Sequence, residues 1–475
     1  MAKKFNLKRV VCAAALATGA LAAGTAFATT PVNQGVYTPI AYQPSDPRGD
    51  LSDLTWRANQ MDDLIANNES AILTSSPDLG TQWMNRITIS GILNVDAAIS
   101  QRSYASTGAT PVSLKAEGLS PNYGNAFNHG YESGLWLNDS EIDIDAQINC
   151  WIKAHVALMG GDDNSNVQEA QHSGLGFQSN TINPGERKLS TTDNWIDEAY
   201  ITLGDFTQTP FYATVGREYV PFGHYVKNEL TPAATTYLTE TQATAADVGF
   251  VTPFYNASNV YGSFYILDGL HETNANYATN GGTSPNRLAN FGADLGINKK
   301  DQTFGYSAGV SYLQNMADIN TITNVITGFG MGSGNVSGGY ATNIPALSGY
   351  AGANYGPFNA EVDGVSALRN FSTADLGYVE NGTLMGALPA AINAKAGYNF
   401  STLGHDSEVY FRYDHSWESV ALALPQNQYL GAYNIDLAKN TSMEFQVMYN
   451  DDYSTSNGGT GKGSVEGAAR LSVLF

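Results

Sequence analysis

The sequence predicts an all-β fold, a transmembrane antiparallel β-barrel of about 16 strands that follows a short N-terminal helix. Three observations predict it. The chain begins with an export signal, apolar and polar residues alternate with a period of two along residues 83–475, and the connections between these segments alternate between short and long. The composition agrees, because the chain holds 49 Gly, 27 Tyr and 19 Phe but only 14% charged residues.

Residues 1–28 have the features of a cleaved signal peptide. A basic segment ends at Arg9, an apolar stretch runs from Val10 to Ala23, and Ala26-Phe27-Ala28 fits the small-x-small cleavage rule. Cleavage removes four of the 23 basic residues and none of the 44 acidic ones, so 19 and 44 remain and the net charge becomes −25. Such an acidic chain is not expected to bind nucleic acid, which needs a basic surface.

Residues 29–82 are expected to form a periplasmic linker with one short helix. Asp46 is a suitable N-cap and Pro47 a suitable first helical residue. Two interpretations remain open for this helix. It lies against the barrel as an amphipathic helix, or it forms a short coiled coil that makes the protein a homo-oligomer. The apolar positions with heptad spacing are Leu51, Leu54, Ala58, Met61 and Ile65.

The alternation begins near Trp83 and marks residues 83–475 as the barrel. Odd positions from Ile87 to Ile99 are apolar or glycine, and most even positions are polar. In a strand the two sets face opposite sides, and an apolar outer face with a polar inner face is typical of membrane barrels. The segments with this pattern are residues 84–100, 140–149, 151–160, 194–204, 210–218, 245–252, 258–268, 288–298, 302–314, 345–355, 357–369, 388–400, 406–416, 427–438, 441–450 and 466–475.

The connections between these segments are alternately short and long, seven short turns and eight long loops. Outer-membrane barrels have short periplasmic turns and long extracellular loops, so both ends of the barrel are expected in the periplasm. Sixteen strands enclose a lumen too wide for side chains to fill. The third long loop, Tyr219 to Thr244, contains Pro221, Gly223 and Pro232, and by analogy with porin constriction loops we expect it to fold into the lumen.

The inward-facing charged residues are the candidate functional residues. Acids outnumber bases among them, which predicts a preference for small cations. The alternative is that many of these charges only pair across neighbouring strands. The sequence shows no catalytic constellation, no metal-ligand spacing among its seven His residues and no cofactor motif, so neither an enzyme nor a cofactor is expected. The predicted pore-lining residues are Arg86, Asp96, Asp143, Asp145, Lys153, His155, Glu361, Asp363, Lys395, Glu408, Arg412, Asp414 and Glu444.

Several stretches of the chain resemble the LbtU-family siderophore porins. The resemblance implies a bacterial outer-membrane location, contact with membrane lipid, and uptake of a ferric siderophore through the lumen without a TonB-type receptor. Two alternatives stay open, a general cation-preferring diffusion porin and a non-conducting structural or adhesive barrel. The stretches that carry the resemblance are Trp83–Gly91, Asp145–Asn149, Trp151–Leu158, Asp197–Ile201, Val215–Gly223 and Thr239–Ala245.

Overall fold

The computed structural model describes most of the chain from Ile87 to the C-terminus. The predicted signal peptide and the predicted helix of residues 46–68 lie outside the described part. The described ranges are 87–102, 132–149, 151–160, 196–205, 208–224, 229–254, 258–269, 271–272, 290–299, 304–327, 339–340, 343–373, 375–422, 424–459 and 461–475.

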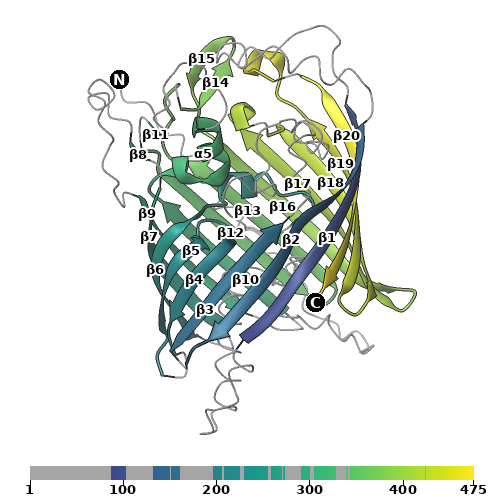
Figure 1. Ribbon diagram of the computed structural model, residues 1–475. Helices are drawn as coiled ribbons and strands as arrows, with labels where there is room; N and C mark the ends of the chain where they lie inside the picture. Colours follow the sequence, from purple (N-terminus) through teal and green to yellow (C-terminus); the bar gives the residue numbers. More distant parts are fainter. Residues whose placement is uncertain are drawn as a thin grey trace.

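Sixteen antiparallel strands form a closed barrel (Figure 1), as the sequence predicts. The last strand pairs with the first, with Asp96 opposite Arg470. Phe475 and Gly91 exchange two backbone hydrogen bonds of 3.0 Å across this seam. The strands are β1 (Ile87–Arg102), β2 (Glu132–Gln147), β3 (Ile152–Gly160), β4 (Ile196–Leu203), β5 (Phe211–Tyr219), β6 (Gln242–Pro253), β7 (Ser258–Leu267), β9 (Asn290–Lys299), β10 (Phe304–Leu313), β12 (Ala346–Tyr355), β13 (Phe358–Ala367), β16 (Ala390–Thr402), β17 (His405–Trp417), β18 (Asn427–Ala438), β19 (Thr441–Asp451) and β20 (Gly463–Leu474).

The outer surface of the barrel is apolar and the inner surface is polar. On β19, Phe445, Val447 and Tyr449 are exposed, whereas Gln446 between them is buried and faces inward. The same alternation holds on β1, where Leu93 is exposed and Asp96 is buried. An apolar band around a closed barrel of this size is the architecture of outer-membrane porins.

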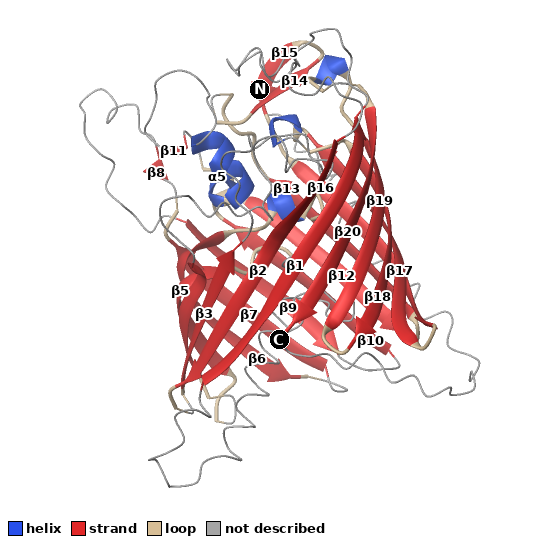
Figure 2. Ribbon diagram, turned by 45° about the vertical axis from the view of Figure 1, so that its right-hand side comes forward, coloured by secondary structure: helices blue, strands red, loops and turns tan. Residues whose placement is uncertain are grey.

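Smaller elements occupy the long connections at the end of the barrel opposite the short turns, where Figure 2 shows the helices in blue. None of the described helices is long and apolar enough to cross a membrane. These elements are the 3₁₀ turns η4 (Thr236–Leu238), η6 (Met316–Asp318), η7 (Val420–Leu422) and η8 (Thr455–Asn457), the helix α5 (Asn320–Thr327), the parallel pair β8 (His271–Glu272) and β11 (Gly339–Tyr340), and the hairpin of β14 (Gly377–Glu380) and β15 (Thr383–Gly386).

The strand limits differ from the predicted ones at the loop end of the barrel. β2 begins at Glu132 instead of residue 140, so the first long loop is shorter than expected. β6 begins at Gln242 instead of residue 245. In both cases the extra residues continue the ladder, with Glu132 opposite Ser100 and Gln242 opposite Tyr219. Backbone pairing there extends beyond the segment in which apolar residues alternate regularly.

Candidate functional site

The third loop, defined here as residues 220–241 between β5 and β6, is the main feature of the lumen. Its described residues are almost all buried, and Phe222, Tyr237 and Leu238 are completely so. Its neck is closed by a 2.9 Å hydrogen bond from the Val220 N–H to the Thr241 carbonyl. A loop that projected into solvent would not bury its large side chains, so the third loop packs against the rest of the protein.

Gly223 turns the third loop toward the far side of the barrel. Its φ of 82° lies in the left-handed region that favours glycine. A Cβ atom at this position would collide with the side chain of Thr239. The Gly223 N–H donates a 2.7 Å hydrogen bond to the Ser311 hydroxyl on β10, so the backbone is held at this point by a distant strand.

The first charged anchor of the third loop is His224. Its Nδ1 lies 2.7 Å from Glu361 Oε1 and 3.1 Å from Asp363 Oδ1, both on β13. Its ring packs against Tyr350, with 4.9 Å between ring centroids. Burial alone would lower the pKa of His224, but the negative charges of Glu361 and Asp363 and their hydrogen bonds prevail and raise it to about 10.

The second charged anchor is Arg412 on β17, which is completely buried. Its guanidinium donates hydrogen bonds of 2.7 and 3.3 Å to the carbonyls of Thr231 and Pro232 in the third loop. It also bonds Asp414 at 2.9 Å and Glu229 of the loop at 3.4 Å. A buried arginine with this set of partners holds the loop strongly, because removing it would leave buried charge and carbonyls unpaired.

Further contacts fix the loop to the opposite part of the barrel wall. The Thr231 hydroxyl donates a 2.6 Å hydrogen bond to Gln446 on β19. Leu230 packs with Ala468 on β20 and Ala98 on β1. The loop leaves the wall between β5 and β6 and contacts β10, β13, β17, β19 and β20 in turn, so it crosses the lumen. This confirms the expectation that the third loop folds inward.

The loop after β10 packs onto the third loop from the mouth side. Asn320, at the start of α5, accepts a 3.0 Å hydrogen bond from the Gln242 N–H and donates its own N–H to the Glu240 carbonyl at 3.1 Å. A single apolar cluster joins these segments to the adjoining wall and fills this part of the mouth. Its members include Val220, Phe222, Tyr237, Leu238, Met316, Ile319, Ile322, Ile344, Phe371, Leu376, Leu422 and Leu424.

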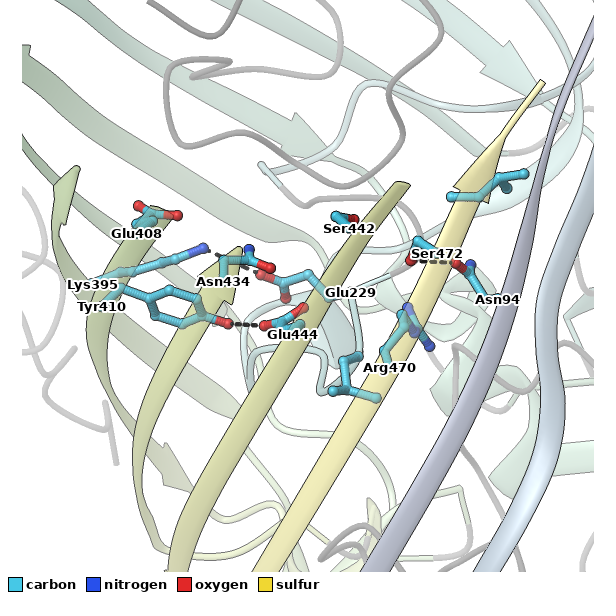
Figure 3. A pocket seen from close by; sticks show the side chains of 12 residues that line it. Asn94, Glu229, Lys395, Glu408, Tyr410, Asn434, Ser442, Glu444, Arg470 and Ser472 are labelled. Carbon is cyan, nitrogen blue, oxygen red and sulfur yellow. Dashed lines mark hydrogen bonds and ion pairs between the residues drawn. The ribbon is translucent and has the colours of Figure 1, made fainter. Parts of the chain in front are cut away.

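Beneath the third loop, toward the short turns, the lumen has a small polar hollow (Figure 3). Lys395 lies 3.7 Å from Glu229 and 4.4 Å from the centre of the Tyr410 ring. The Tyr410 hydroxyl donates a 2.6 Å hydrogen bond to Glu444. Three carboxylates and two cations line the hollow, so its wall is net negative. The charged lining residues are Glu229, Lys395, Glu408, Glu444 and Arg470.

Most of the predicted pore-lining residues lie around the third loop and the hollow beneath it, and the others lie elsewhere. Arg86 lies outside the described residues. Asp143, Asp145, Lys153 and His155 lie on β2 and β3, and His155 Nδ1 is 2.8 Å from Asp145. The remaining predicted residues contact the third loop, line the hollow or, as Asp96 does, pair with a residue that lines it. They are Asp96, Glu361, Asp363, Lys395, Glu408, Arg412, Asp414 and Glu444.

Sequence reasoning missed four residues that matter here. Arg470 forms two hydrogen bonds of 2.7 and 2.6 Å to Asp96, and its place at a polar position of the last strand pattern was a usable signal. Tyr410 stands at an inward position of β17, but the sequence analysis takes only charged inward residues as candidates. His224 and Glu229 lie in a loop, where no periodicity marks which side chains turn inward.

Comparisons with known proteins give distant relatives. No family model matches the chain. A UPF0422 protein of Coxiella burnetii is 24% identical over 355 residues, which cover 73% of this chain and 65% of that protein. The UPF0422 protein lpl2888 of Legionella pneumophila is 25% identical over 378 residues, 74% of this chain and 64% of that protein. The chain therefore spans just under two thirds of the length of the curated relatives that it matches.

Similar solved structures are porins and channels of low sequence identity. The anion-selective porin from Comamonas acidovorans has a TM-score of 0.48 and 11% identity, over 82% of this chain and 99% of that chain. The outer membrane channel DcaP of Acinetobacter baumannii has a TM-score of 0.42 and 10% identity, over 82% of this chain and 97% of that chain.

Proposed function

We propose that the protein is an outer-membrane channel for small polar solutes, in which the third loop forms the constriction. The observation that carries the proposal is the course of this loop across the lumen, from its neck at Val220 to the contact of Leu230 with the seam of the barrel. A barrel that served only as a structural wall would not need charged anchors at two points of an internal loop.

The charges around the constriction support a preference for cations. The hollow is net negative, and Arg470 is already neutralised by its paired hydrogen bonds to Asp96. Lys395 is similarly occupied by Glu229. A cation entering the hollow meets Glu408 and Glu444 on the wall, and focused negative potential raises the local concentration of cations.

Purified protein in planar lipid bilayers tests this proposal. Under a KCl gradient the reversal potential should show a preference for K⁺ over Cl⁻. Glu444→Gln should lower this preference, because it removes one charge from the hollow while the amide still accepts the Tyr410 hydroxyl. Val447→Ala on the outer face is the matched control and should leave the preference unchanged. Absence of discrete conductance steps in the wild type would refute the channel.

The solute class can be specified further as a ferric siderophore, on the strength of the resemblance to the LbtU-family porins. The negative hollow favours neutral or cationic ferric complexes over anionic ones. Uptake of radiolabelled iron, supplied as one siderophore of each charge class to iron-starved cells, tests this. Deletion of the gene should reduce uptake of a neutral or cationic complex, and the intact gene should restore it. Unchanged uptake in cells that lack other iron receptors would refute the siderophore while leaving the channel in place.

A further inference from the structure

We propose that His224, Glu361 and Asp363 form a binding site for one divalent first-row transition ion, which clamps the third loop to β13. The three side chains are all buried, and one ligand atom of each lies within 4.8 Å of the others. His224 Nδ1 is 2.7 Å from Glu361 Oε1 and 3.1 Å from Asp363 Oδ1. Adjacent ligands of an octahedral ion with bonds of about 2.1 Å are about 3.0 Å apart, so these separations suit an ion with little movement.

Each ligand is fixed by contacts outside the cluster. Glu361 and Asp363 are two residues apart on β13, so both face inward, and the strand is paired on both sides by β12 and β16. The backbone of Gly223, next to His224, is held by Ser311. The cluster is therefore preorganised, and an ion would bind without first ordering a flexible loop.

The charge balance around the cluster favours an added cation. The ion pairs of the third loop form two groups, and Glu361 of one lies opposite Lys395 of the other in the pairing of β13 with β16, so the two groups make one largely buried network. Among the described residues it holds four carboxylates against two permanent cations and one histidine. A proton on the histidine leaves this network with one excess negative charge, whereas a divalent ion beside a neutral imidazole balances it fully. Buried charge that is left uncompensated is costly. The network consists of His224, Glu229, Glu361, Asp363, Lys395, Arg412 and Asp414.

The second nitrogen of His224 provides an independent observation. Nε2 is buried and, within the part of the chain that the structure describes, has no hydrogen-bond partner. A doubly protonated ring would bury a charged N–H group without an acceptor here. A ring that binds an ion through Nδ1 keeps the Nε2 proton but carries no charge, so the N–H without an acceptor is then that of a neutral ring, and the positive charge lies between the three ligand atoms.

The ligand set indicates the class of ion. One imidazole nitrogen and two carboxylate oxygens suit Zn²⁺, Mn²⁺ or Fe²⁺, whereas Ca²⁺ and Mg²⁺ prefer oxygen ligands alone. Three protein ligands also leave coordination positions open for water. The sequence does not predict this cluster, because His224 lies 139 residues from Asp363 and no short spacing connects them.

Calorimetric titration of the metal-stripped full chain in detergent with Zn²⁺, with Mg²⁺ in excess to occupy weak acidic sites, tests the proposal. We expect one tight site in the wild type. His224→Gln and Asp363→Asn each remove one ligand. Each should lower the affinity for Zn²⁺ by at least roughly 10- to 100-fold, which is the loss seen when only a hydrogen-bond partner of a ligand is removed. His415→Gln is the matched control and should keep wild-type affinity, because the hydrogen bond described for His415, between Nδ1 and Asn427 Oδ1 at 2.7 Å, lies outside the proposed site.

Two results would overturn the site, namely no tight Zn²⁺ binding in the wild type, or unchanged affinity in both ligand variants. Heat-dependent gel mobility identifies any variant that does not form the barrel. For such a variant, the visible spectrum of Co²⁺ bound to the wild type replaces the mutational evidence, because it reports whether a histidine nitrogen is among the ligands. All of these readouts measure binding, so failure of the channel proposal would leave this test intact.

Discussion

Replacement of Arg412 by methionine should release the third loop from the wall. The side chain is completely buried and gives two hydrogen bonds to loop carbonyls in addition to its contacts with Asp414 and Glu229. Breaking a buried ion pair by removing one partner costs about 3–5 kcal/mol. Because each 1.4 kcal/mol is about tenfold in an equilibrium constant, the detached loop should become about 100- to 4,000-fold more populated.

Single-channel recording in planar bilayers measures this effect. We expect Arg412→Met to show larger and noisier conductance steps than the wild type, because a detached loop widens the lumen and moves. Lys299→Met is the control. It removes one positive charge at the short-turn end of β9, at a position that shares the outward parity of the exposed Leu295. Identical conductance in the two variants would refute the assignment of Arg412 as the anchor.

Three further predictions concern the loop and the barrel wall. Gly223→Ala should destabilise the loop by about 1–3 kcal/mol, because the φ of 82° and the nearby Thr239 side chain disfavour a Cβ atom. We expect a lower melting temperature and a noisier current. Unchanged values would contradict the role of Gly223 in turning the loop. In EDTA, the ion pair of His224 should stabilise the protein fully below the ordinary histidine pKa of 6.5 and lose this contribution as the pH rises through about 10. The melting temperature of the wild type should therefore exceed that of His224→Gln by less at pH 11 than at pH 7. A difference that stays constant with pH would argue against a charged His224. Val447→Arg, on a 63% exposed outer position, should cost about 2–4 kcal/mol in lipid vesicles by urea unfolding, whereas Ser442→Arg, at an inward position, should cost less.

The barrel itself could be predicted from sequence because its signal is periodic. Each strand repeats the alternation, and sixteen repeats with alternating short and long connections leave few other folds. The ends of the strands, such as Glu132 at the start of β2, were harder to predict, because backbone pairing continues there without a regular apolar face. Inward positions on the strands, such as Asp96 and Arg412, follow from the same parity.

The candidate site could be predicted only in part, because it depends on a loop. The length and position of the third loop indicated, by analogy with porin constriction loops, that it enters the lumen. It did not indicate which wall residues the loop would meet. His224 and Glu229 find partners on β13, β16 and β17, more than 130 residues later in the chain, and such contacts leave no local pattern. Hence Glu361 and Lys395 were predicted as pore-lining but not as anchors.

The most direct test of the account is the single-channel conductance of the protein with its third loop removed, by joining Tyr219 to Gln242 through a short Gly-Ser linker. These residues are paired neighbours at the ends of β5 and β6, so the barrel can close without the loop. The account predicts that the wild type conducts in small cation-preferring steps and that the shortened protein conducts in steps several times larger. Equal steps in the two proteins would contradict the claim that the third loop is the constriction.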